Sequence, residues 1–192
     1  MNVLLLGPQG SGKGTQAKRV ARDYGIPHIA TGDIIRAMKD EPSELGRELK
    51  AVYDRGDLVS DELMIRLIED RLGREDAQEG FILDGFPRTM AQAEALDEML
   101  RELDRKLDIV LEFQLRDRDT LERRLLQRAL EEDRSDDTPE AIARRLALYY
   151  EQTEPLVEYY RARGILVGIP AEPPVAEVFA EIQRALEQAA VR

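Results

Sequence analysis

The sequence predicts an α/β fold of three layers, with a central parallel sheet of five strands and helices on both of its faces. Two observations lead to this fold class. Short β-type runs alternate with longer helical patterns, and such alternation builds right-handed βαβ crossovers and a mostly parallel sheet. The chain has 192 residues, of which 43% are hydrophobic and 35% charged, which suits a single globular domain with a proper core.

Strand and helix patterns follow one another along the chain. Strands are expected at Asn2 to Leu6, around His28 and Ile29, at Phe81 to Asp84, at Ile109 to Leu115 and at Ile165 to Ile169. Helices are expected at Lys13 to Tyr24, Asp61 to Leu72, Thr89 to Leu103, Asp119 to Glu132, Thr138 to Arg161 and Pro174 to Ala189. Pro155 should kink the helix in which it lies, because proline removes a backbone donor and clashes with the preceding turn.

Two stretches interrupt this alternation. Residues 31–59 hold two short helical patterns and no strand pattern, so we expect an insertion there. A charged patch from Glu131 to Asp137 joins two helices, and Thr138 and Pro139 then suit the cap and first position of the second helix. Asp136 and Asp137 could hold nearby arginines in place or only lie favourably at that helix N-terminus, and the sequence leaves both interpretations open.

Charge and cysteine content exclude several classes of function. The formal net charge of −11 argues against nucleic acid as the main partner, because a duplex needs an extended basic face. Small anionic ligands need only a local group of arginines and lysines. Cysteine is absent, which excludes disulfides and thiolate zinc sites. No apolar run approaches the length of a membrane span and the N-terminus lacks a signal peptide's basic region, so we expect a cytoplasmic protein with no membrane partner.

A glycine-rich stretch between the first strand and the first helix has the spacing of a phosphate-binding loop. It runs Gly7-Pro8-Gln9-Gly10-Ser11-Gly12-Lys13-Gly14-Thr15. Backbone N–H groups of such a loop close around phosphate oxygens, the helix N-terminus adds partial positive charge, and the lysine reaches the β- and γ-phosphates. An ordinary glycine-rich turn is the alternative, but it does not account for the lysine and the hydroxyl together. The α/β fold is therefore expected to be of the P-loop NTPase-like type.

Three further polar residues are candidates for the chemistry beside this loop. Asp84 ends an apolar strand, so its carboxylate should emerge next to the P-loop, where it suits Mg²⁺ bound through water. The alternative is a polar residue that starts a turn with Gly85. Arg88 and Arg36 each present a planar fork that can pair with two oxygens of an acceptor phosphate, although either one alone could be an ordinary surface residue.

Helical geometry selects more arginines in the helices that flank the charged patch. Because residues advance by about 100° along a helix, Arg124 and Arg128 project near the apolar stripe of the first helix, whereas Arg123 points away. In the second helix Arg145 lies at the edge of the stripe and Arg144 points away. Inward arginines suit an anionic ligand, and local pairing with acids on the same helix is the alternative.

Several motifs in a fixed order carry a family resemblance. They are the P-loop, Thr31-Gly32-Asp33-Ile34-Ile35-Arg36, Gly56-Asp57-Leu58-Val59, Asp84-Gly85-Phe86-Pro87-Arg88-Thr89 with Gln92, Arg124-Leu125-Leu126-Gln127-Arg128, Arg134-Ser135-Asp136-Asp137 and Arg144-Arg145-Leu146. Through them the chain resembles the nucleoside monophosphate kinases, and the adenylate kinases in particular. Few residues separate Arg128 from Arg134, as in the short-lid type. The resemblance implies a single kinase domain over residues 1–192, with a monophosphate-binding insertion at 30–59 and a short lid at 127–137.

The resemblance also implies a reaction and a site. The reaction would be reversible transfer of a phosphoryl group from Mg²⁺-bound ATP to AMP, giving two ADP, in adenine nucleotide homeostasis, and the enzyme would be a monomer. The ATP-binding residues would be Gly10, Ser11, Gly12, Lys13, Gly14, Thr15, Arg124, Arg128 and Pro173. The AMP-binding residues would be Thr31, Arg36, Asp57, Leu58, Val59, Gly85, Arg88, Gln92, Arg134 and Arg145. Catalytic roles would fall to Lys13, Arg88, Arg128, Arg134 and Arg145, with Mg²⁺ at Asp84 through water.

The choice of AMP depends on two threonines. Enzymes for UMP and CMP typically carry Ala and Asn where this chain has Thr31 and Thr89, which favours AMP, although Thr31 also suits a helix N-cap. A UMP, CMP or GMP kinase of the same fold is one alternative, and a nucleotide-binding module without catalysis is another. His28, the only histidine, is interpreted as structural rather than as a phosphohistidine.

Overall fold

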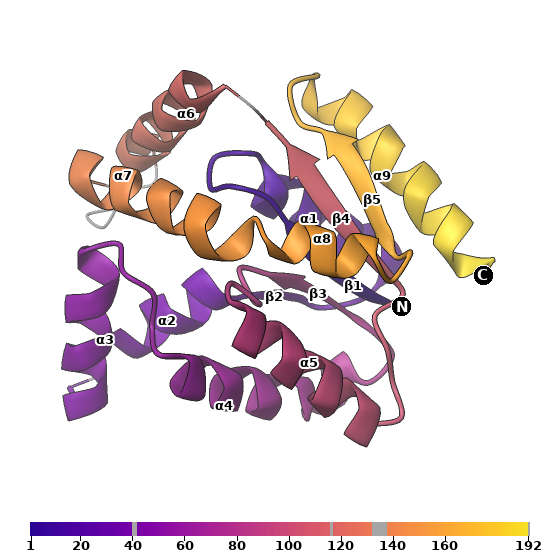
Figure 1. Cartoon of the computed structure of the whole chain (residues 1–192), viewed down its shortest axis with the longest axis horizontal. Helices are drawn as coiled ribbons and strands as arrows, with labels where there is room; N and C mark the ends of the chain where they lie inside the picture. The colour runs from indigo at the N-terminus through magenta and orange to yellow at the C-terminus, as the bar shows by residue number, and fades with distance from the viewer. Residues whose placement is uncertain (40–41, 116, 132–137, 192) are drawn as a thin grey trace.

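The computed structural model describes residues 1–39, 42–115, 117–131 and 138–191 (Figure 1). Its centre is a five-stranded, wholly parallel sheet of strand order β2-β3-β1-β4-β5, which confirms the expected sheet. The strands are β1 (Asn2–Leu6), β2 (His28–Ala30), β3 (Phe81–Asp84), β4 (Ile109–Gln114) and β5 (Leu166–Pro170).

Helices connect these strands. They are α1 (Lys13–Tyr24), α2 (Thr31–Lys39), α3 (Glu44–Asp54), α4 (Asp61–Leu72), α5 (Met90–Glu102), α6 (Arg118–Glu131), α7 (Pro139–Leu148), α8 (Leu156–Arg161) and α9 (Val175–Ala190), with a 3₁₀ turn η1 (Glu75–Ala77) and a π-helical turn η2 (Tyr149–Thr153). In the part of the chain that the structure describes, none of the helices has the length and apolar character needed to cross a lipid bilayer.

The single helix expected from Thr138 to Arg161 is divided in the structure. It starts as expected, because the Thr138 hydroxyl accepts a hydrogen bond from Ala141 N–H at 3.2 Å and Pro139 is the first helical residue. The wider turn η2 then separates α7 from α8, and Pro155 lies directly before α8. Proline cannot donate the backbone hydrogen bond of a continuous helix, so the disruption expected at Pro155 takes the form of a break.

Helices cover both faces of the sheet. The pleat of β1 sends Leu4 and Leu6 into a cluster with α4, α5 and α8, and it sends Val3 and Leu5 into a second cluster with α1, α6, α7 and α9. All four side chains are buried. In Figure 1, α4 and α5 lie on one side of the strands and α9 on the other. The sheet is therefore covered on both faces, and the loops at its carboxyl edge follow strands that belong to a packed core.

The segment between β2 and α4 interrupts the alternation of strands and helices, as expected. It forms α2 and α3, which pack against each other, and no strand among its described residues. Ser43 caps α3 by accepting a hydrogen bond from Gly46 N–H at 2.9 Å. Buried Ile35 and Leu49 join the core cluster of α4 and α5. Figure 1 shows α2 and α3 on the same side of the molecule as the ends of α6 and α7.

Candidate active site

The P-loop follows β1 and leads into α1. Gly12, at φ 91°, precedes α1 and provides no side-chain cap, so the first N–H groups of the helix are left for a ligand. Gly10, at φ 83°, has no room for a side chain, since a Cβ there would lie 3.0 Å from Leu121 O. The Ser11 hydroxyl is buried and has no hydrogen-bond partner among the described residues. The loop thus presents unused donors, as an anion site requires.

Lys13 lies at the centre of this loop. Its Nζ donates to Gly7 O at 2.6 Å and to Pro8 O at 2.8 Å. Its pKa is lowered from 10.5 to about 8, mainly by burial; Asp84 opposes the shift, and Arg88 and Arg128 contribute to it. A phosphate bound in the loop would favour the charged form again. The site therefore holds a lysine that is charged at neutral pH but loses its proton more readily than an exposed lysine unless an anion is bound.

Asp84 lies beside the P-loop, at the end of β3. Its backbone pairs with Leu5 in the sheet, and its Oδ2 is 3.3 Å from Nε2 of His28. Burial alone would raise the pKa of Asp84, but the hydrogen bond from His28 and the nearby charges of Lys13 and Arg88 bring it below its usual value. The carboxylate stays ionised in the cavity. The contact also shows that His28, interpreted from sequence as structural, supports this carboxylate.

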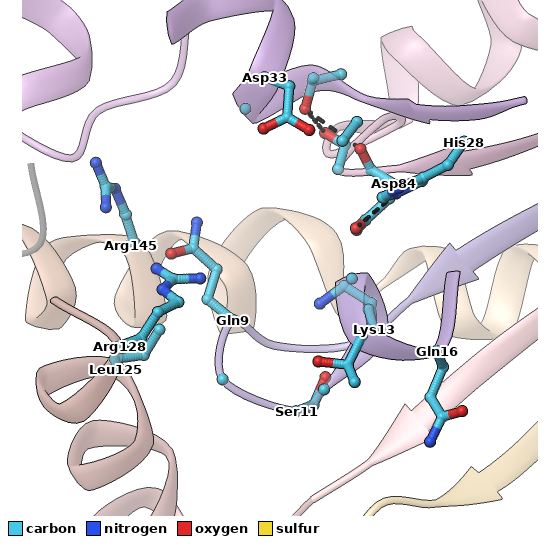
Figure 2. A pocket seen from close by; sticks show the side chains of 18 of the residues that line it. Gln9, Ser11, Lys13, Gln16, His28, Asp33, Asp84, Leu125, Arg128 and Arg145 are labelled. Atoms are coloured by element: carbon cyan, nitrogen blue, oxygen red, sulfur yellow. Dashed lines mark hydrogen bonds and ion pairs between the residues drawn. The ribbon is translucent and has the colours of Figure 1, made fainter. Parts of the chain in front are cut away.

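Figure 2 shows the two sides of the cavity around Lys13. Asp84 and His28 lie on one side, joined by a dashed line, while Arg128 and Arg145 lie on the other side. A ligand between them would contact positive groups on one side and a carboxylate on the other. This arrangement suits a phosphate chain with a metal ion bound to it.

The turn after β3 faces the start of α2. Thr31 is buried and its hydroxyl donates to Gly85 O at 3.1 Å, while Arg88 Nε donates to the same oxygen at 2.7 Å. Burial lowers the pKa of Arg88, with Tyr53 and Asp84 opposing the shift, and a guanidinium keeps its charge at neutral pH. A partly buried, forked cation that is held in place by a carbonyl oxygen suits a phosphate ligand.

Tyr53 of α3 holds two arginines at the cavity. Its hydroxyl accepts from Arg36 Nη1 at 2.6 Å, and Arg36 also pairs with Asp33. Its carbonyl oxygen accepts from Arg145 Nη2 at 2.9 Å, and the Arg145 guanidinium carbon lies 4.8 Å from the tyrosine ring centre. The sequence analysis missed Tyr53, because a tyrosine in a helix gives no local signal of such contacts.

The arginines of α6 and α7 point as helical geometry predicts. Arg124 Nη1 lies 3.4 Å from Ala171 O at the cavity, whereas Arg123 bonds the Thr120 hydroxyl on the exposed side of α6. Arg145 is only 7% exposed, and exposed Arg144 instead pairs with Asp57 at 3.0 Å.

One cavity of about 590 Å³ brings the predicted residues together. Its lining includes Gly10, Ser11, Gly12, Lys13, Gly14, Thr15, Thr31, Arg36, Asp57, Leu58, Val59, Asp84, Gly85, Arg88, Gln92, Arg124, Arg128, Arg145 and Pro173. Arg134, Asp136 and Asp137 lie outside the described residues. Residues that the sequence analysis did not place in a ligand site also line it, among them Gln9, Gln16, His28, Asp33 and Tyr53. The predicted residues that the structure describes, scattered over 164 positions from Gly10 to Pro173, thus line one cavity.

A family model and individual relatives all indicate the same protein family for this chain. A sequence model of the family described as adenylate kinase matches residues 5–165. A protein named adenylate kinase from Thermobifida fusca (strain YX) is 50% identical over 190 residues, which cover 99% of this chain and 100% of that protein. The protein of the same name from Cyanothece sp. (strain PCC 7425 / ATCC 29141) is 46% identical over 186 residues, which cover 97% of this chain and 95% of that protein. The one from Archaeoglobus fulgidus is 41% identical over an alignment of 214 residues, which covers 98% of this chain and 99% of that protein. With the parallel sheet and the P-loop, these matches confirm the P-loop NTPase-like fold class. The chain belongs to the adenylate kinase family.

Proposed function

We propose that the protein transfers a phosphoryl group reversibly from Mg²⁺-bound ATP to AMP, giving two ADP, and so serves adenine nucleotide homeostasis. The observation that carries this proposal is that one cavity is lined by two candidate phosphate sites: the P-loop with Lys13, and the arginines Arg88 and Arg36. In the proposed architecture, residues 1–192 form one kinase domain, residues 30–59 bind the monophosphate and residues 127–137 form a short lid. Its monomeric state, its cytoplasmic location and the lack of a nucleic-acid partner stay predictions.

The donor nucleotide is assigned to the P-loop side. Backbone N–H groups from Gly10 to Thr15 and the start of α1 would hold the phosphates, with Lys13 between the β- and γ-phosphates. Arg124 and Arg128 of α6 would neutralise charge on the same chain of phosphates, and Pro173 would flank the nucleotide where it lines the cavity.

The acceptor nucleotide is assigned to the side of α2 and α5. Arg36 and Arg88 would hold its phosphate, joined by Arg145 and Arg134 when the lid closes. The remaining AMP contacts would come from Thr31, Gly85, Gln92 and the backbone of Asp57, Leu58 and Val59.

The residues beside the P-loop suit Mg²⁺, which keeps bound water, better than they suit a metal ion whose ligands all come from the protein. No group of three or more acidic or histidine ligands occurs among the described residues, and Asp84 offers one ionised carboxylate to the cavity. Mg²⁺ keeps several waters and is commonly bound by one or two carboxylates and substrate phosphates. Asp84 would hold it through water. The ion would supply neutralisation of charge on the β- and γ-phosphates.

Transfer needs no general base, because the acceptor phosphate is already ionised near neutral pH. The side chains act by position and charge: Lys13, Arg88, Arg128, Arg134 and Arg145 would surround the group in transfer. Water is the competing acceptor. Closure of the insertion and the lid over both nucleotides would exclude water and complete the set of arginines only when both sites are filled.

The test is turnover of ATP with AMP, UMP, CMP and GMP in parallel. We expect AMP to be the preferred acceptor by a large margin, and preference for another monophosphate would contradict the proposal. A folded Lys13→Met variant should lose nearly all turnover with AMP. ATP binding without any ADP formed from any monophosphate would instead support a non-catalytic nucleotide-binding module.

A further inference from the structure

A chain of hydrogen bonds joins the first turn of α4 to the first turn of α5 beside the proposed AMP site. Gln92 Nε2 donates to Asp61 Oδ1 at 2.8 Å, and Gln92 Oε1 accepts from the backbone N–H of Arg88 at 2.8 Å. The Thr89 hydroxyl donates to both Asp61 oxygens, at 3.0 and 3.1 Å. The carboxylate of Asp61 and the amide of Gln92 are therefore both held in place.

These two partners fix which end of the Gln92 amide is oxygen and which is nitrogen. A carboxylate can only accept a hydrogen bond, and a backbone N–H can only donate one. If the amide turned by 180°, its oxygen would face the carboxylate of Asp61 and its NH₂ group would face the N–H of Arg88. Gln92 is only 2% exposed, so water could not readily replace the two lost bonds. The amide consequently has one orientation.

The fixed amide keeps hydrogen-bonding capacity for a ligand. An amide side chain has two N–H donors and two acceptor lone pairs, and its bonds to Asp61 and Arg88 use one of each. Gln92 lines the cavity, and one N–H and one lone pair of its amide are not used by the two bonds to Asp61 and Arg88. Adenine offers a donor at N6 beside an acceptor at N1. Guanine and hypoxanthine offer the reverse, an acceptor at O6 beside a donor at N1.

We infer that Asp61 is a positioning residue for base specificity, because it locks the Gln92 amide in the orientation that reads adenine. The inference rests on the proposed function and adds a residue that the predicted AMP site did not contain. A glutamine that is free to turn can match either arrangement of donor and acceptor. Because Asp61 and the Arg88 N–H hold the Gln92 amide in one orientation, the amide disfavours a base in which the donor and the acceptor have exchanged places.

The test compares AMP with IMP in the Asp61→Asn variant. Hypoxanthine reverses the donor and acceptor at positions 6 and 1 without the 2-amino group of guanine. Asparagine can offer either N–H or oxygen to Gln92, so in this variant only the Arg88 N–H still opposes the turned amide. We expect the ratio of kcat/KM for AMP to that for IMP to fall by at least about tenfold, with the KM for ATP unchanged. Part of this fall should be a gain in kcat/KM for IMP.

Two further variants make the test specific. Glu62→Gln removes an acidic side chain from the same first turn of α4, but this residue is exposed, and it should leave the ratio unchanged. Thr89→Val removes the hydroxyl that holds Asp61 and should lower the ratio by at least about threefold, even if Asp61→Asn does not fold. Loss of the Thr89 cap on α5 would weaken folding but would not favour IMP over AMP.

The outcomes separate this inference from the proposed function. A wild-type protein that does not phosphorylate AMP would contradict the proposed function itself. A wild-type protein that prefers AMP to IMP, with the same ratio in folded Asp61→Asn and in Thr89→Val, would overturn only the role of Asp61. Equal loss of activity with both acceptors would likewise overturn it, because a merely structural defect does not distinguish the bases.

Discussion

Lys13 shows how burial makes one residue sensitive to pH. Its pKa is lowered from 10.5 to about 8, first by burial, so below pH 8 the site holds a charged lysine and above pH 8 a neutral one. We expect the affinity for an Mg²⁺-bound, non-hydrolysable ATP analogue to be constant below pH 8 and about tenfold lower at pH 9 than at pH 7. Calorimetric titration across this range measures the effect.

The same shift has the opposite consequence for folding without a ligand. Because the pKa of the unfolded chain's lysine is higher, the unfolded state binds more protons between about pH 8 and 10.5. The contribution of Lys13 to the free energy of unfolding should therefore rise with pH in this window and stay at its lower level below pH 8. Lys13→Met is the control for both effects. Equal affinity of the wild type at pH 7 and pH 9, or the same loss in Lys13→Met, would contradict the role of Lys13.

At the residue scale, the sequence predicts those groups whose signal is local. The P-loop spacing predicts Lys13, and the end of an apolar strand predicts Asp84. His28 was not expected at the site because its partner, Asp84, is 56 positions away. Gln92 lies three residues after Thr89, as in a capping box, but its side chain accepts from Arg88 N–H and donates to Asp61 of another helix. Contacts of this kind depend on how helices pack, which no short motif encodes.

At the scale of elements, the turn after α3 is docked closely on α7. Gly56 has φ +76°, and a Cβ there would lie 2.5 Å from Ala141 O. The following residue, Asp57, pairs with Arg144 of α7 at 3.0 Å and with Arg55 at 3.1 Å. At Gly56 the backbone has a left-handed conformation and lies so close to Ala141 of α7 that a side chain would not fit. The glycine therefore allows the insertion to pack directly against α7.

Replacing this glycine tests that contact. Gly56→Ala should lower the free energy of unfolding by at least about 2 kcal/mol, because backbone strain adds to the clash with Ala141. Gly25→Ala is the matched control: φ there is +66°, but open space surrounds the position, so only about 1 kcal/mol of strain is expected. Denaturant unfolding of both variants gives the comparison. Equal losses would mean that the contact with α7 contributes nothing.

The boundaries of elements show what periodicity can and cannot predict. Lys13–Tyr24 and Asp61–Leu72 form helices with the expected ends, because each has a clear start and a clear stop. The helix expected to continue from Thr138 to Arg161 is interrupted by η2 instead. Apolar spacing alone does not distinguish an α-helical turn from a π-helical one, since the extra residue of a π turn is decided by tertiary packing and by Pro155.

At the scale of the whole molecule, the sheet order places the phosphate loop and Asp84 together. β1 is the central strand and β3 is its neighbour, although 74 residues separate the end of β1 from the start of β3. Alternation of strands and helices predicts a parallel sheet, and the carboxyl edge of such a sheet is the expected ligand site. Which strands are neighbours is not contained in that pattern. The sequence pattern alone therefore does not predict that the P-loop and the acceptor-side residues line one cavity, and only the structure shows it.

The shared cavity predicts that one ligand can occupy both sites. A mimic of two adenosines joined by a phosphate chain should contact the P-loop and Gln92 at once, whereas the same phosphate chain with one adenosine can fill only one base site. At a concentration one hundred times its Kd, a ligand stabilises the fold by about 2.7 kcal/mol. For a chain of this size, that corresponds to a rise in Tm of about 5–10 °C.

The comparison is made with both ligands at the concentration that saturates the two-adenosine mimic, so that the second base site alone accounts for the difference in Tm. Gln92→Ala should remove most of that difference and leave the stabilisation by the one-adenosine ligand unchanged, because the proposal assigns Gln92 to the acceptor nucleotide. Hydrogen exchange should show the same division: both ligands should slow exchange at the start of α1, and only the mimic should slow it at the start of α5. If both ligands raise Tm equally and protect the same amides, the two phosphate sites do not serve two nucleotides, since a second bound adenosine must add contacts of its own.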